Sequence, residues 1–145
     1  MTDCNQAGSP PAYLFLDFDG VLHPGLSGTF CYLDRLETVL RELPHVRIVL
    51  STSWRLESDF ETELRPLFSP ELRARIVGCT PDLPGQLRET EIEAWRARHA
   101  IGHHRWAALD DDASLFRVGS PGLILCDPAR GVRPAQLIEL RSKLG

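Results

Sequence analysis

Short apolar runs alternate with amphipathic segments from residue 13 to the end of the sequence. The runs have the length and the branched and aromatic composition of β-strands, and they cover residues 13–17, 46–51, 75–79, 106–109 and 123–126. The first run is apolar on both faces, as a central strand of a parallel sheet has to be. The pattern predicts an α/β fold with a central five-stranded parallel sheet and helices on both of its faces.

The amphipathic segments between these runs have the periodicity of helices. Residues 33–43, 87–100 and 134–144 each place their apolar side chains on one face, and the last segment has a proline in its first turn. A further helix is expected from residue 53 to about residue 67, interrupted at Pro66. Residues 25–32 have no clear period, so both a small β-flap and a plain loop stay open for them.

The connections between the predicted elements are short, and neither a linker nor a repeat divides the sequence. A length of 145 residues is enough for one domain with a hydrophobic core. We therefore expect a single domain over residues 13–145, preceded by a flexible N-terminal tail over residues 1–12.

Composition and charge narrow the class of protein. The sequence has 43% hydrophobic and 25% charged residues, as ordinary globular proteins do. Its net charge of −4 gives no general basic surface for nucleic acid, although a local arginine patch would be enough to bind it. No apolar run approaches the roughly 20 residues of a membrane span, and the N-terminus lacks the pattern of a secretory signal. These features predict a cytoplasmic protein with no membrane partner.

The cysteines predict neither a zinc knuckle nor a redox motif. They lie far apart and form no C-x-x-C pair, at Cys4, Cys31, Cys79 and Cys126. We expect buried, reduced thiols, as is usual for a cytoplasmic protein.

Polar side chains follow three of the predicted strands at the point where each strand ends. They form three clusters, Asp17 with Asp19, Thr52 with Ser53, and Asp110 with Asp111 and Asp112. The carboxyl ends of parallel strands meet at one edge of a sheet, where the ligands of open α/β folds bind. One such cluster is compatible with a simple turn or a helix cap, but three of them predict a binding site.

The residue types in these clusters indicate the ligand. Several carboxylates without histidine or cysteine favour a hard cation with oxygen ligands, Mg²⁺ first. A bound cation would let Asp17 and Asp110 both stay ionised in one pocket. A metal and hydroxyl donors together suit a phosphoryl group, whose transition state spreads negative charge over its oxygens.

Three motifs in order resemble the haloacid dehalogenase (HAD) superfamily. DFDGV resembles its motif I, IVLST its motif II and WAALDD its motif IV, and the resemblance spans about residues 13–126. The combination of VLSTSWR, R-x-x-EI-x-x-W and LDDD is most similar to the HAD domain of Swiss-army-knife RNA repair proteins. The resemblance implies a three-layer Rossmann-like (HAD-like) fold. The intervals between the motifs leave room for a small flap after the first strand but not for a cap domain.

The resemblance also implies roles for motif I and motif II. Asp17 would be the nucleophile that forms an aspartyl-phosphate, and it would bind Mg²⁺ through its other oxygen. Asp19 would be the general acid and then the general base, with its backbone carbonyl on Mg²⁺. Gly20 would allow the tight turn around the substrate. Thr52 would donate its hydroxyl to the phosphoryl group, with Ser51 as the competing residue.

The remaining roles concern the metal and a catalytic cation. Asp110 would be a metal ligand, and Asp111 a second ligand or an outer carboxylate. The superfamily usually places a lysine before motif IV, but Lys143 is the only lysine and lies after it. An arginine therefore has to serve, and we expect Arg88, with Arg55 as the second candidate.

Several of these residues have simpler interpretations. Arg88 could instead pair with Glu91 along its helix, and Ser53 could cap the following helix as well as contact substrate. Asp112 is expected to cap the turn at residues 113–116. Trp54 could stack on a base, although we favour a core position, and His23 is expected to be an exposed loop residue.

The sequence thus predicts a Mg²⁺-dependent phosphomonoester hydrolase, and the resemblance implies nucleic-acid ends or nucleotides as its substrates. An uncapped site also leaves water free to reach the aspartyl-phosphate, which favours hydrolysis over transfer. Two alternatives stay open. One is a phosphatase of a phosphoprotein or a small phosphometabolite, and the other is a phosphate-binding module without turnover. A P-loop kinase is excluded because no G-x-x-x-x-G-K-[ST] motif occurs.

Overall fold

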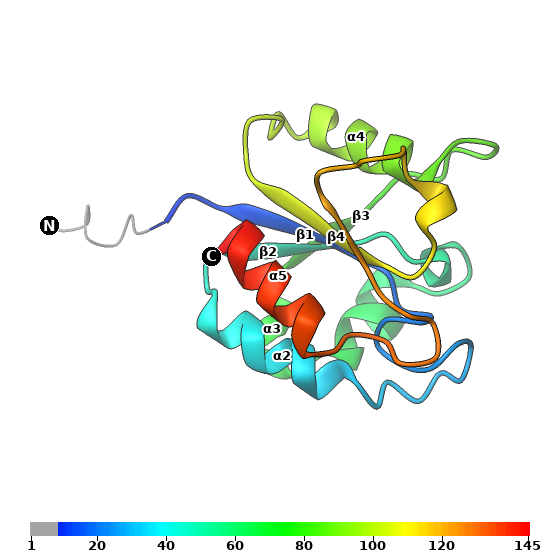
Figure 1. Ribbon diagram of the computed structural model, residues 1–145, viewed down its shortest axis with the longest axis vertical. Helices are drawn as coiled ribbons and strands as arrows, with labels where there is room; N and C mark the ends of the chain where they lie inside the picture. Colours follow the sequence, from blue (N-terminus) through cyan, green and yellow to red (C-terminus); the bar gives the residue numbers. More distant parts are fainter. Residues whose placement is uncertain (1–8) are drawn as a thin grey trace, which may run out of the picture.

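The computed structural model describes residues 9–145 and contains one parallel five-stranded sheet with the order β3-β2-β1-β4-β5. The strands are β1 (Ala12–Leu16), β2 (Val46–Leu50), β3 (Ile76–Cys79), β4 (Trp106–Asp110) and β5 (Leu123–Leu125). Figure 1 shows β1 in the middle of the sheet, between β2 and β4. The predicted parallel sheet is confirmed, and its strand ends differ from the expected ones by at most one residue.

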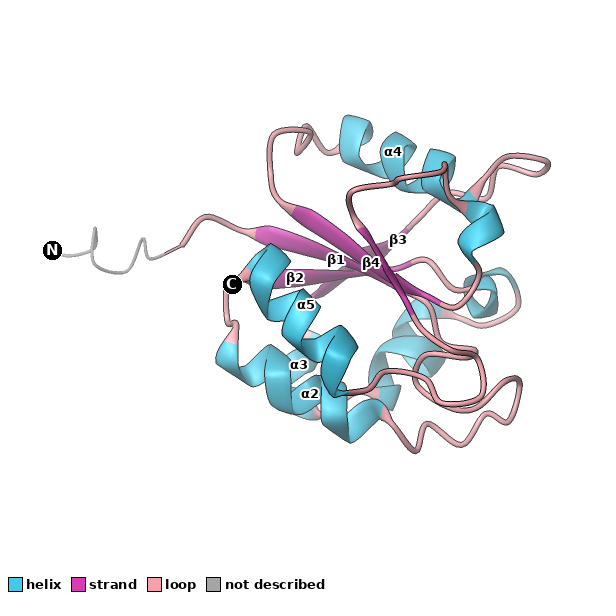
Figure 2. Ribbon diagram, in the orientation of Figure 1, coloured by secondary structure: helices cyan, strands magenta, loops and turns pink. Residues whose placement is uncertain are grey.

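Helices cover both faces of the sheet, as expected. The helix α4 (Arg88–Arg98) lies on one face, and α2 (Leu33–Glu42), α3 (Pro70–Arg73) and α5 (Pro134–Leu144) lie on the other (Figures 1 and 2). The α4 face buries Ile92 and Trp95 against the sheet, and the opposite face forms the larger hydrophobic cluster. The structure is therefore a three-layer, Rossmann-like α/β fold.

The helix expected over residues 53–67 is not continuous, and this prediction was wrong. The chain forms three short turns instead, η1 (Ser53–Leu56), η2 (Phe60–Leu64) and η3 (Arg65–Leu67). Asp59 is the N-cap of η2, because its carboxylate accepts a hydrogen bond from the Thr62 backbone N–H at 2.8 Å. Pro66 has no N–H to continue a helical ladder.

Residues 25–32 form a plain loop without a strand, so the flap after β1 is not a β-flap. Between β1 and β2 the chain adds only this loop and α2, and none of the described segments forms a cap domain. The predicted tail lies mostly outside the described residues, and Ala12 at its end already belongs to β1.

The register of the central strands brings the polar clusters to one level. Leu16 of β1 lies opposite Leu50 of β2 and Leu109 of β4. Directly beyond, the Asp17 N–H donates to the Leu109 carbonyl at 3.1 Å, and the Ser51 N–H donates to the Leu16 carbonyl at 2.9 Å. The strand order reverses between β1 and β4, so the carboxylates lie at the switch point where α/β sheets bind ligands.

The three cysteines that the structure describes are free thiols but differ in exposure, which corrects the expectation that all are buried. Cys31 is exposed, Cys79 is half-buried and Cys126 is buried. Cys4 lies outside the described residues. No helix within residues 9–145 is long and apolar enough to cross a membrane.

These exposures predict a selective alkylation pattern. Burial, reinforced by the nearby Asp110, raises the pKa of the Cys126 thiol to about 12, so it stays protonated and unreactive at pH 8. We expect iodoacetamide to modify Cys31 in the folded protein and to leave Cys126 unmodified until denaturant is added. Peptide mass spectrometry measures both sites, and rapid native modification of Cys126 would contradict the prediction.

Candidate active site

Three carboxylates converge at the switch point. Asp17 follows β1, Asp110 ends β4 and Asp111 is the next residue, and one oxygen of each lies within 4.8 Å of the others. Asp17 and Asp110 are buried and Asp111 is half-buried. Asp17 accepts a hydrogen bond from the Phe18 N–H at 2.8 Å, which fixes its carboxylate at the strand end.

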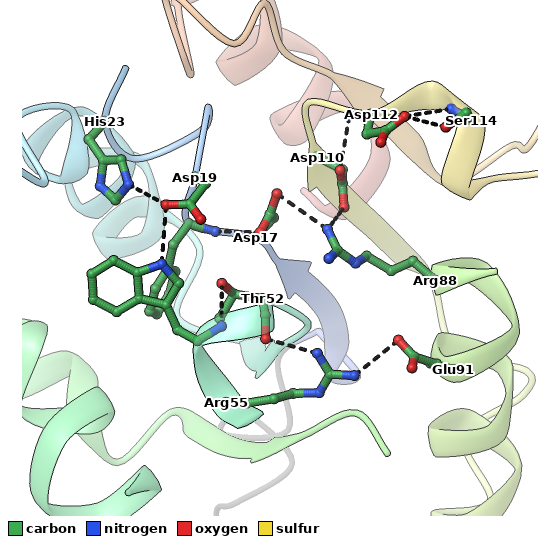
Figure 3. A network of polar contacts seen from close by, with 12 residues as sticks. Asp17, Asp19, His23, Thr52, Arg55, Arg88, Glu91, Asp110, Asp112 and Ser114 are labelled. Carbon is green, nitrogen blue, oxygen red and sulfur yellow. Dashed lines mark hydrogen bonds and ion pairs between the residues drawn. The ribbon is translucent and has the colours of Figure 1, made fainter. Parts of the chain in front are cut away.

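Arg88 reaches into this group from the first turn of α4. Its Nη1 atom lies 2.8 Å from Oδ2 of Asp110 and 3.3 Å from Oδ2 of Asp17 (Figure 3). The helix pair with Glu91 does not form, because Glu91 contacts Arg55 and the Leu83 N–H instead. Arg88 is thus the cation that the structure brings to the carboxylates.

One arginine does not balance the negative charge of the cluster. Burial and then the neighbouring Asp110 raise the pKa of Asp17 to about 8, although Arg88 acts in the opposite direction. Burial also raises the pKa values of Asp110 and Asp111. A divalent cation would relieve this crowding, and a set made only of oxygen ligands fits Mg²⁺.

Gly20 gives Asp111 its place in the cluster. The glycine has a φ of +74°, and a Cβ atom there would overlap the Asp111 carboxylate. The residue is therefore needed both for the left-handed backbone and for the space that the carboxylate fills.

A Gly20→Ala variant is expected to lose both properties. The strained backbone should lower the free energy of unfolding by about 1–2 kcal/mol, and the displaced Asp111 should weaken the rise in unfolding temperature that we expect on adding Mg²⁺. Thermal unfolding with and without Mg²⁺ measures both effects. Gly25→Ala is the matched control, because Gly25 has a φ of +45° but a Cβ atom added there would have nothing within 4 Å. An equal Mg²⁺ response in both variants would contradict the role of Gly20.

Asp19 lies apart from the three-carboxylate cluster. Its Oδ1 atom is 2.7 Å from His23 Nε2 and 3.1 Å from Trp54 Nε1. Its side chain, 22% exposed, borders a pocket of about 390 Å³ lined by Asp19, Ser53, Trp54, Glu57 and Ser58. The metal contact predicted for Asp19 involves its backbone carbonyl and stays a prediction.

The hydroxyl groups after β2 differ in their surroundings. Thr52 is buried and caps η1, since its Oγ1 accepts a hydrogen bond from the Trp54 N–H at 3.3 Å. This contact uses the hydroxyl oxygen as an acceptor, so the hydroxyl proton of Thr52 can be donated to a ligand oxygen. The cap is thus Thr52 and not the expected Ser53, which is exposed at the pocket. Ser51 Oγ is buried without a hydrogen-bond partner among the described residues.

Arg55, the second candidate for the motif III cation, does not reach the three carboxylates, and its expected contact with substrate stays a prediction. Its guanidinium donates to the backbone carbonyls of Thr52 at 2.9 Å, Thr80 at 2.9 Å and Pro81 at 3.2 Å. It also pairs with Glu91 at 3.0 Å, and its side chain is 6% exposed (Figure 3). Arg55 is therefore a structural clamp between the turn after β2, the loop after β3 and α4.

Two further side chains correct or confirm the sequence predictions. Asp112 caps η4 (Ala113–Leu115) by accepting from the Ser114 N–H at 3.0 Å, as expected. His23 was expected to be exposed but is fully buried against Asp19. Its spacing of four residues from Asp19, the distance of one helical turn, was the signal available in the sequence.

The fold and the site together define an α/β domain of the HAD superfamily, with motif I after the central strand and motif IV after its neighbour. The profile of a family described as "HAD domain in Swiss Army Knife RNA repair proteins" matches residues 13–137, and the chain belongs to this family. No curated protein and no solved structure matches the chain significantly. Membership in the family indicates hydrolase chemistry on a phosphorylated substrate.

Proposed function

We propose that this protein is a Mg²⁺-dependent phosphomonoester hydrolase that works through an aspartyl-phosphate on Asp17. The observation that carries the proposal is the contact of one guanidinium, Arg88, with the buried carboxylates Asp17 and Asp110. Asp19, two residues after Asp17, borders a separate open pocket. A nucleophile, a fixed cation and a separate carboxylate for proton transfer are the parts that phosphoryl transfer needs.

Asp17 attacks phosphorus while the bond from phosphorus to the leaving oxygen breaks. Asp19 donates a proton to that oxygen and becomes a carboxylate. In the second half, Asp19 takes a proton from water, the water oxygen bonds to phosphorus, and the bond to Asp17 breaks to release inorganic phosphate. Arg88 and the Thr52 hydroxyl stabilise the charge on the phosphoryl oxygens.

The carboxylates of Asp17, Asp110 and Asp111 would hold the metal, and Mg²⁺ bound there supplies positive charge against the phosphoryl oxygens. Asp110 also accepts from the Asp112 N–H at 3.0 Å, which holds it in place. Asp17 and Asp110 keep their orientation through these backbone donors and Arg88.

The substrate that we propose is a phosphorylated nucleic-acid end or nucleotide. The family description, which refers to RNA repair, supports it. The absence of a cap domain among the described segments supports it too, because a large substrate can reach Asp17 and water can follow.

Two assays test the proposal. The first measures turnover of p-nitrophenyl phosphate with and without Mg²⁺, and turnover that needs Mg²⁺ is expected. The second compares RNA and DNA carrying labelled 5′- or 3′-terminal phosphates with a phosphoserine peptide and a sugar phosphate. We expect faster turnover of the nucleic-acid ends. Faster turnover of the peptide or the sugar phosphate would instead indicate a phosphoprotein or a small phosphometabolite as the substrate. Binding without any turnover would establish a phosphate-binding module.

A further inference from the structure

The two oxygens of the Asp19 carboxylate have different surroundings. Oδ1 accepts from the indole N–H of Trp54 at 3.1 Å and contacts His23 Nε2 at 2.7 Å. Within residues 9–145, no side chain or backbone group is hydrogen-bonded to Oδ2. In Figure 3, the second oxygen of Asp19 lies on the side away from His23. The carboxylate is therefore held by one oxygen and free at the other.

The burial of His23 indicates which of its nitrogens carries a proton. The ring is 0% exposed, and its Nδ1 atom has no partner among the described residues. A bare lone pair at Nδ1 costs less than an unpaired N–H there, and Oδ1 of Asp19, which carries no proton in the proposed mechanism, only accepts hydrogen bonds. The neutral tautomer with a proton on Nε2 satisfies both conditions and makes His23 a donor to Asp19.

Aromatic rings fix the positions of both donors. Phe30 meets the His23 ring edge-on at a centroid distance of 4.8 Å and the Trp54 ring at 5.3 Å, and Phe18 packs on Trp54 at 5.6 Å. Phe30 has a φ of +53°, which is costly for a bulky side chain. The loop of residues 25–32 is therefore strained at Phe30, the residue whose ring packs against His23.

We propose that His23 and Trp54 are positioning residues for proton transfer, which hold Asp19 through Oδ1 so that Oδ2 alone exchanges protons with the substrate. The inference rests on the proposed role of Asp19 as acid and base. During the first half-reaction, the proton leaves Oδ2 for the leaving oxygen, and the carboxylate that remains is stabilised by the two donors on Oδ1. During the second half-reaction, Oδ2 takes a proton from water.

The test uses substrates that differ in their need for an acid. p-Nitrophenol leaves phosphorus without much help, whereas the alcohol of β-glycerol phosphate needs a proton. Trp54→Phe removes the N–H and keeps a ring, and we expect it to lower kcat for β-glycerol phosphate about 10-fold more than kcat for p-nitrophenyl phosphate, with KM little changed. Trp106→Phe is the matched control, because Trp106 packs on the α4 side of the sheet.

A second pair of variants tests the histidine. His23→Gln retains an N–H donor and is expected to keep most of the activity on β-glycerol phosphate, whereas His23→Leu fills the space without a donor and should reproduce the selective loss. Thermal unfolding of each variant shows whether it is folded under assay conditions, and Trp54→Phe alone decides the question if the His23 variants do not fold.

Equal losses for both substrates in Trp54→Phe, or no loss, would overturn the positioning role while leaving the hydrolase proposal intact. A wild-type protein that turns over neither substrate with Mg²⁺ would instead overturn the hydrolase proposal, and the positioning role with it.

Discussion

Asp17→Asn is expected to abolish turnover of p-nitrophenyl phosphate, with a loss of at least about 10³-fold in kcat, because an amide cannot form the aspartyl-phosphate. Asp19→Asn should also lower kcat, but it leaves the carboxylates of Asp17, Asp110 and Asp111 in place. The two variants are therefore expected to differ in their binding properties as well as in rate.

The measurement combines steady-state kinetics with thermal unfolding in Mg²⁺. The proposed metal site predicts a rise in the unfolding temperature of the wild type on adding Mg²⁺, and the Asp19→Asn variant should keep this rise, since the carboxylates of Asp17, Asp110 and Asp111 are unchanged. Asp34→Asn is a suitable control, because Asp34 is exposed in the first turn of α2. Retained turnover in Asp17→Asn would remove Asp17 from the role of nucleophile.

Substitutions of Arg88 and Arg55 are expected to have different effects: loss of Arg88 should reduce activity, and loss of Arg55 should reduce stability. Arg88→Met should lower kcat by about 10²–10³-fold, because it removes the fixed cation that faces the reacting phosphoryl group. Arg88→Lys should retain part of this activity, since lysine keeps the charge but not the planar fork of donors. Arg55→Met should instead lower the free energy of unfolding by about 3 kcal/mol or more, because Glu91 loses its buried partner.

Urea unfolding and kinetics at a temperature where each variant is folded distinguish the two outcomes. The expected result is a folded but slow Arg88→Met protein and a less stable Arg55→Met protein with nearly normal kcat. The reverse pattern would assign the catalytic cation to Arg55 and the structural role to Arg88.

The convergence of the carboxylates was predictable because it depends on strand register. Each polar cluster follows an apolar strand directly, and the parallel pairing of Leu16 with Leu50 and Leu109 leaves the next residues on one level. The arginine at the start of α4 was predictable for the same reason, since the loop before it returns the chain to that edge.

The role of Arg55 was not predictable, because its partners come from segments that no local sequence pattern brings together. Three partners of Arg55 are backbone carbonyls, which any sequence provides. The burial of His23 was not predictable either, because it comes from the packing of Phe30 and Trp54 against its ring. The prediction of one helix over residues 53–67 was wrong because the Asp59 cap and Pro66 favour separate turns over one continuous series of helical hydrogen bonds.

The Arg55–Glu91 pair constrains how sequences of this family can diverge. The two charges are nearly excluded from water, so a substitution that removes either one leaves the other without a partner of opposite charge. Glu91 also lies one helical turn from Arg88, so the loss affects the segment that carries the proposed catalytic cation. The two positions are therefore expected to change together during evolution, and relatives without the arginine should also lack the acid.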